Sequence, residues 1–138
     1  MTKDLWINLP VKDLNKSKAF FTAIGFELNT GMGNSEHSAA IKVGTKNIIV
    51  MLFTDFVFKQ IVGRDFTDTS KSSEVLFSFD AESKEEVDAI AIKVEKAGGK
   101  LFSKPAENQG WMYGCGFEDL DGHRWNVLHM DFSKMPKM

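Results

Sequence analysis

Apolar and polar positions in the first half of the chain follow two different periods. Four short stretches alternate or run continuously apolar, which predicts β-strands, and one longer stretch has helical spacing. Asp13 or Asn15 can cap the start of that helix, which covers residues 13–25, and Gly25 can end it. The predicted strands are residues 5–11, 26–30, 38–44 and 46–53.

The second half repeats this order. Ser83 and Glu86 form a capping-box pair at the start of an amphipathic helix, which Gly98 and Gly99 end. An Asp-Gly turn at residues 121–122 joins the last two strands into a hairpin. The predicted strands are residues 73–80, 100–105, 111–120 and 123–131. Each half therefore reads strand–helix–strand–strand–strand.

This internal repeat predicts an α+β fold of two βαβββ modules within a single domain, 1–138. Module one covers about 4–54 and module two about 73–132, and residues 55–72 form a short helix and a polar linker. One such unit cannot bury its sheet face alone. We therefore expect the modules to form a curved mixed sheet with a concave cleft, which is a natural place for a small-molecule ligand.

Composition narrows the possible partners. The net charge of −2 over 138 residues gives no electrostatic reason for binding nucleic acid or an anionic membrane. No apolar run approaches the ~20 residues of a membrane helix, and the N-terminus has no signal-peptide pattern. The single cysteine, Cys115, rules out an internal disulfide. We expect a cytoplasmic protein.

Two segments carry a family resemblance. "LPVKDLNKSKAFFTAIGF" (9–26) and "GFEDLDGHRWNVL" (116–128), in this order and together with "MYG", resemble the vicinal oxygen chelate (VOC) superfamily. That group contains glyoxalase I, extradiol dioxygenases, fosfomycin-resistance proteins and bleomycin-binding proteins. The chain looks most like its bacterial lactoylglutathione-lyase-related subgroup. The resemblance covers nearly the whole chain, and it implies the two-module fold and a homodimer.

The resemblance also implies four positions for a divalent metal. In metal-using members, inward-facing side chains on four strands hold an ion that stabilises an enediolate. Carried over to this chain, the positions are Trp6, Met51, Glu74 and Asn126. Indole does not bind such ions, a thioether prefers soft ions, and an amide oxygen is a weak ligand. We therefore expect no cofactor, and a divalent metal is disfavoured.

Glu74 is the one carboxylate left in this set. On an apolar concave face beside Leu76 and Leu128, its pKa would rise, and it could act as a general base. The alternative is a structural carboxylate that Arg124, Asn8 or Asn126 satisfies. The candidate ligand-binding residues of the cleft, several of them aromatic, are Trp6, Asn8, Met51, Phe53, Leu76, Trp111, Met112, Tyr113, Asn126 and Leu128.

The remaining polar residues predict no further site. We expect His37, His123 and His129 on the surface or on the second sheet face, and Asp119 and Asp121 setting the turn geometry.

Three functional classes remain open. The leading hypothesis is metal-independent binding of a small hydrophobic or aromatic molecule, as in bleomycin-resistance proteins. The alternative is a glyoxalase-type isomerase or lyase that uses Glu74, or a metal site outside the four positions. The third is a structural or partner-binding module. The sequence does not decide whether the protein is an enzyme.

Overall fold

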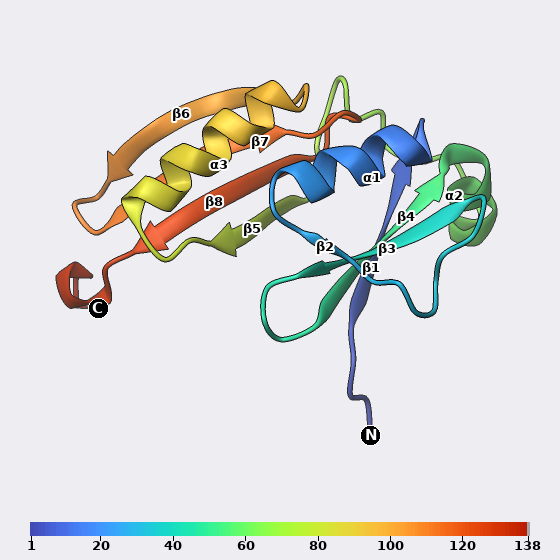
Figure 1. Ribbon diagram of the computed structural model, residues 1–138, viewed down its shortest axis with the longest axis horizontal. Helices are drawn as coiled ribbons and strands as arrows, with labels where there is room; N and C mark the ends of the chain where they lie inside the picture. The colour runs from blue at the N-terminus through green and yellow to red at the C-terminus, as the bar shows by residue number, and fades with distance from the viewer. Residues whose placement is uncertain (138) are drawn as a thin grey trace. The chain divides into compact units, whose positions relative to one another are not determined.

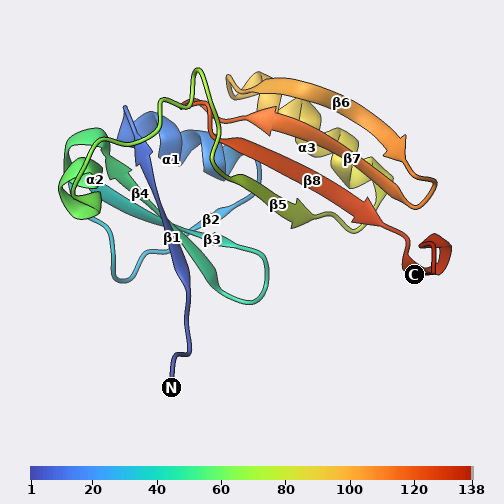
Figure 2. The same ribbon diagram turned by 180° about the vertical axis from the view of Figure 1, so that it is seen from behind.

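The computed structural model describes residues 1–137. The chain divides into two compact units, Met1–Ser72 and Ser73–Met138, each built around its own four-stranded mixed sheet. Figures 1 and 2 show the same arrangement in both units, with a helix lying along one face of a sheet. We describe each unit by itself.

The first unit, Met1–Ser72, contains module one and the connecting segment after it. Its elements are β1 (Trp6–Val11), α1 (Leu14–Ala23), β2 (Glu27–Leu28), β3 (Ser38–Val43), β4 (Ile48–Thr54) and α2 (Asp55–Val62). The sheet order is β1-β4-β3-β2, with β1 parallel to β4 and the other pairs antiparallel. Helix α1 packs on β2, β3 and β4.

Local sequence explains where α1 begins and ends. The Asp13 side chain accepts a hydrogen bond from the Lys16 backbone N–H at 3.1 Å, which caps the first turn. Phe20 and Phe21 are fully buried on the inner side of the helix. Gly25, with φ +113°, reverses the chain after the helix, a conformation that other residues rarely adopt.

Module two has the same element order. Its elements are β5 (Leu76–Asp80), α3 (Lys84–Lys96), β6 (Lys100–Asn108), β7 (Met112–Glu118), β8 (Arg124–Met130) and the 3₁₀ turn η1 (Phe132–Lys134). The sheet order is β5-β8-β7-β6, with β5 parallel to β8. The Ser83 side chain caps α3 by accepting from the Glu86 N–H at 3.1 Å.

An aromatic core lies between α3 and the sheet. Trp125 and Phe117 are cross-strand partners, both fully buried, with parallel rings 6.3 Å apart. Phe77 and Phe79 of β5 pack on the same indole, with ring centroids 4.8 and 6.2 Å away. Val87, Ile90, Ala91 and Val94 of α3 cover the cluster. Burying side chains of this size contributes about 1.5–3 kcal/mol each.

The two-module βαβββ architecture predicted from sequence is confirmed, with differences at element ends. The second strand of module one shrinks to two residues, Glu27–Leu28. Strand β5 begins at Leu76 rather than at 73, which leaves Glu74 on a bend before it. Strand β6 continues to Asn108 through two register shifts, which hydrophobic periodicity does not reveal.

Among residues 1–137, no helix has the length and apolar character needed to span a membrane.

Candidate functional site

Helices α1 and α3 each pack on one face of the sheet in their unit. In module one, the residues that alternate with the buried Leu9, Val50 and Leu52 form the side opposite α1, which we call the Met51 face. Its members are Trp6, Asn8, Pro10, Ile49, Met51, Phe53, Ser38, Ala40 and Lys42. Four predicted ligand-binding residues, Trp6, Asn8, Met51 and Phe53, therefore share one face.

A loop of module one covers the centre of the Met51 face. Met51 pairs in register with Asn8 on one side and Ala40 on the other. A Cβ built on Gly33 would lie only 3.1 Å from the Met51 Sδ, so the 29–37 loop rests on that thioether. Three hydrogen bonds fasten this loop. Asn34 Nδ2 donates to the Asn29 carbonyl and the Ser38 hydroxyl to the Gly33 carbonyl, while Asn34 Oδ1 accepts from the Ala40 N–H of β3. The Met51 position is therefore packed with apolar atoms.

Asn8 has an unsatisfied amide. Its Oδ1 is buried, and no hydrogen-bond partner for it exists among the described residues. Such a group costs about 1–3 kcal/mol, so a native structure that keeps one needs a reason. A water or ligand that donates a hydrogen bond would supply that reason.

The side of the module two sheet opposite α3, the Asn126 face, is built in the same way. Its members are Leu76, Ser78, Asp80, Arg124, Asn126, Leu128, Met130, Met112, Gly114, Gly116, Glu118 and Phe102. Asn126 lies in register between Ser78 and Gly116. Its partners on both sides are small, and residues 1–137 provide no hydrogen bond to its side chain.

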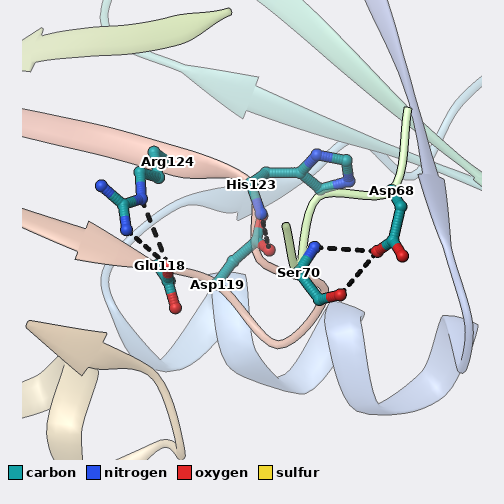
Figure 3. Close-up of polar contacts among 6 residues, drawn as sticks. All are labelled: Asp68, Ser70, Glu118, Asp119, His123 and Arg124. Carbon is teal, nitrogen blue, oxygen red and sulfur yellow. Dashed lines mark hydrogen bonds and ion pairs between the residues drawn. The ribbon is translucent and has the colours of Figure 1, made fainter. Parts of the chain in front are cut away.

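Two glycines of β7 make room for larger side chains on this face. A Cβ on Gly116 would overlap the ring tip of Phe102, and a Cβ on Gly114 would lie 2.6 Å from the Leu128 Cδ2. The Arg124 guanidinium lies 4.3 Å from the centre of the Phe102 ring. Arg124 also donates from Nη2 to Glu118 Oε1 at 3.0 Å (Figure 3). Phe102 and Leu128 therefore flank the Asn126 amide.

The turn before β8 is built around Asp119. Its Oδ1 accepts from the backbone N–H groups of Asp121 and His123, both at 3.0 Å (Figure 3 shows the second contact). Its Oδ2 accepts from the Trp125 indole N–H at 3.1 Å. Burial raises the pKa of Asp119 to about 6, against the opposing effects of His123 and the Trp125 hydrogen bond. Asp119 therefore sets the turn geometry, as predicted.

The two modules correspond position by position. Trp6 is the first residue of β1 and lies seven residues before the N-cap Asp13, while Leu76 is the first residue of β5 and lies seven before the N-cap Ser83. Trp6 pairs with Ile49, which lies two residues before Met51. In the same way, Leu76 pairs with Arg124, which lies two residues before Asn126. Trp6 therefore corresponds to Leu76, and Met51 to Asn126.

Known proteins with this arrangement are similar along nearly the whole chain. A hypothetical protein from S. aureus, SA1046, is 35% identical, with 93% of this chain and 94% of that chain aligned and a TM-score of 0.81. Residues 3–38 match the family model described as bleomycin resistance protein-like N-terminal. The chain belongs to the VOC superfamily.

More distant VOC structures share the fold. A glyoxalase/bleomycin resistance protein/dioxygenase family enzyme from Burkholderia phytofirmans is 18% identical, with 94% of this chain and 100% of that chain covered and a TM-score of 0.79. The fosfomycin resistance protein FosX from Listeria monocytogenes is 19% identical, with coverages of 97% and 98% and a TM-score of 0.66. No curated protein sequence matches the chain significantly.

Because metal-using VOC proteins bind a divalent ion, the residues at the corresponding positions of this chain can be tested for their fit to such an ion. The internal correspondence places Leu76, not Glu74, at the strand position equivalent to Trp6. The four strand positions then hold indole, thioether, isobutyl and carboxamide groups, which do not fit a divalent ion. Within residues 1–137, no group of three or more His, Cys, Asp or Glu side chains lies close enough to hold a metal.

Glu74 does not lie in the environment that the sequence suggested. It is exposed, precedes β5 by two residues, and no described residue forms a hydrogen bond or ion pair with it. Arg124, one of its predicted partners, binds Glu118 instead. The predicted position of Glu74 on a strand is wrong because the ladder with β8 begins only at Leu76. Its role as a base stays a prediction.

Alternation also separates the residues of the predicted aromatic wall. Met112 pairs with Met130 on the Asn126 face, whereas Tyr113 pairs with His129 on the α3 side. The Tyr113 hydroxyl donates to Asp88 of α3 at 2.6 Å, and this bond raises the pKa of Tyr113. Trp111 precedes β7, with its ring 6.2 Å from that of Phe132 and its Nε1 buried without a partner among the described residues. Tyr113 therefore does not join Asn126 and Leu128.

The histidines lie in three different environments. His37 is exposed beside Glu36, and His129 lies on the second face, where its Nδ1 contacts the Ala81 carbonyl at 3.1 Å. His123 is buried, and its backbone N–H donates to Asp119 Oδ1 at 3.0 Å. Burial raises the pKa of the Cys115 thiol to about 11, which suits a structural side chain.

Sequence reasoning missed Phe102, Ser78 and Arg124 as members of the Asn126 face. Ser78 could have been found, because it alternates with Leu76 in the same strand. Phe102 could not, because a register shift on each side of Ser103 interrupts the alternation in β6.

Proposed function

We propose that this VOC protein binds a small hydrophobic or aromatic molecule without a metal ion. One observation carries the proposal: Trp6, Met51, Leu76 and Asn126 occupy the four corresponding strand positions, and none of them is a good ligand for a hard or borderline divalent ion. The resistance proteins among the similar folds, bleomycin- and fosfomycin-directed by name, support a role in holding a foreign or secondary molecule.

The exposed apolar surface of these faces supports binding. Trp6 and Leu76 are 58% and 52% exposed, so these two large apolar side chains are accessible to a ligand. Aromatic and aliphatic side chains with a few polar groups are typical of small-molecule sites. The polar members of these faces include two amides, Asn8 and Asn126.

A binding screen tests the proposal. Metal-free protein is titrated with planar aromatic compounds, glutathione adducts and divalent ions, and its melting temperature is followed. We expect aromatic compounds to raise the melting temperature and Zn²⁺, Ni²⁺ and Fe²⁺ to leave it unchanged. Stabilisation by a divalent ion with about one ion per chain would refute metal independence, and stabilisation by glutathione adducts with turnover would favour the glyoxalase-type alternative.

The homodimer and the cytoplasmic location remain part of this proposal. Partial exposure of α2, where Phe56 is 73% and Ile61 is 56% exposed, supports a second protein surface. Sedimentation of the purified chain at several concentrations measures the oligomeric state directly.

A further inference from the structure

The Asn126 face contains a carboxamide in an unusual setting. Asn126 lies midway along β8 between two neighbours with minimal side chains, Ser78 and Gly116. A strand residue so placed has room above it, and its amide is left with both a donor and an acceptor unused within residues 1–137. A ligand that lies over Asn126 can therefore form two hydrogen bonds with its carboxamide.

An aromatic platform lies next to that amide. The Phe102 ring reaches from the edge strand β6 across Gly116, the register partner of Asn126. The glycine permits this position, because any Cβ there would overlap the ring. On the other side, Leu128 leans over Gly114 and supplies an aliphatic wall. The surroundings of the amide are therefore flat and apolar.

The Arg124 guanidinium beside the platform is already neutralised by Glu118. Arg124 donates from both Nε and Nη2 to the same Glu118 oxygen, at 3.2 and 3.0 Å, while its guanidinium lies against the Phe102 ring. Paired in this way, Arg124 contributes little net charge to this face. Asp80, at the far end of β5 on this face, is acidic and pairs in register with Leu128. These charges do not favour an anionic ligand.

We infer that the ligand of the Asn126 face is a neutral, planar aromatic molecule with an adjacent hydrogen-bond donor and acceptor, such as a primary carboxamide or a lactam. Its donor–acceptor pair meets the Asn126 carboxamide, and its ring lies beside Phe102. This inference rests on the proposed function and adds the chemical class that the site selects.

Three naphthalene probes distinguish the possibilities by calorimetric titration of the wild-type protein. Naphthalene-2-carboxamide has the ring and the hydrogen-bonding pair, 2-methylnaphthalene has the ring alone, and naphthalene-2-carboxylate replaces the donor with a charge. We expect the carboxamide to bind about tenfold more tightly than the methyl compound, as the net effect of satisfying the Asn126 amide. We expect the carboxylate to bind no more tightly than the carboxamide.

Two variants test the named residues. Asn126→Leu should remove the preference for the carboxamide over 2-methylnaphthalene, while Asn15→Leu, a matched change at an exposed position of α1, should keep it. Phe102→Leu should weaken the carboxamide and the methyl compound by a similar factor, about fivefold. Thermal melts of each variant confirm that it is folded.

The outcomes separate the inference from the function on which it rests. If all naphthalenes bind equally, or if Asn126→Leu keeps the carboxamide preference, the assigned ligand class is wrong while small-molecule binding stands. If the carboxylate binds most tightly, Arg124 selects anions and the neutral class is wrong. If neither these probes nor other aromatic compounds bind at all, the proposed function itself fails.

Discussion

The buried indole N–H of Trp125 donates to Oδ2 of the buried Asp119 at 3.1 Å, and this bond ties the Asp-Gly turn to the aromatic core of module two. Asp119 thus satisfies three donors, two backbone N–H groups of the turn and one indole. The turn, which looks like a surface feature in the sequence, is part of the core.

Asp119→Asn should lower the free energy of unfolding by about 1–3 kcal/mol. The asparagine Oδ1 can still accept from the turn, but its Nδ2 then faces the Trp125 N–H, and two donors oppose each other in a buried place. Urea denaturation measures the loss. In the double variant with Trp125→Phe the opposing donor is gone, so the two changes together should cost less than their sum. Simple additivity would contradict the proposed contact.

The raised pKa of Asp119 predicts an unusual pH dependence. The folded protein holds this proton up to about pH 6, whereas the unfolded chain releases it near pH 4. Unfolding therefore releases a proton in this range, and the contribution of Asp119 to stability falls as pH rises from about 4 to about 6. The total fall is about 3 kcal/mol for a shift of this size.

The measurement is the difference in unfolding free energy between wild type and Asp119→Asn at several pH values. Between pH 4 and pH 6, wild type should lose stability relative to the variant. Above pH 7, the difference in unfolding free energy between the two proteins should stay constant. A constant difference across the whole range would show that Asp119 does not titrate in this way.

The sequence predicted the elements of both modules because each carries its own local signals. Asp13, Ser83 and their glycine stops mark the helices, and Phe117, Trp125 and Val127 alternate toward the core. The candidate site was harder to predict, because it depends on strand starts. Counting back seven residues from each N-cap would have led to Leu76 instead of Glu74. Alternation from Phe117 would likewise have put Tyr113 on the helix side.

The surroundings of the two glycines of β7 predict which of two alanine substitutions destabilises the fold more. Gly114→Ala should destabilise more than Gly116→Ala, because its Cβ would lie 2.5 Å from the backbone oxygen of Val127, which cannot yield. At Gly116 the obstacle is the end of the Phe102 side chain, which is 40% exposed and can swing away. We expect about 1–3 kcal/mol for Gly116→Ala and a larger loss for Gly114→Ala, measured by thermal or urea unfolding. Phe102→Leu should relieve Gly116→Ala but not Gly114→Ala; equal relief of both would refute this packing.

Restoring one carboxylate should not restore a metal site. Asn126→Glu places a single good ligand on the Asn126 face, while the corresponding positions still hold Trp6, Met51 and Leu76. Zn²⁺ needs three or more protein donors for tight binding. Competition with a fluorescent zinc chelator should therefore give the same weak response for wild type, Asn126→Glu and Glu74→Gln. Tight zinc binding by Asn126→Glu alone would mean that the correspondence between the modules is wrong.

Because Tyr113 lies apart from the Asn126 face, substitutions of Leu128 and Tyr113 should differ in their effect on ligand affinity. Leu128→Ala removes the aliphatic wall beside Asn126 and should weaken binding of naphthalene-2-carboxamide by about tenfold, the effect of losing much of one apolar contact. Tyr113→Phe removes only the hydroxyl that binds Asp88 on the α3 side, and should leave the dissociation constant unchanged. Titration calorimetry of both variants decides the point. A large loss of affinity in Tyr113→Phe, with the melting temperature preserved, would place the ligand on the helix side of the sheet and refute the Asn126 face as its binding site.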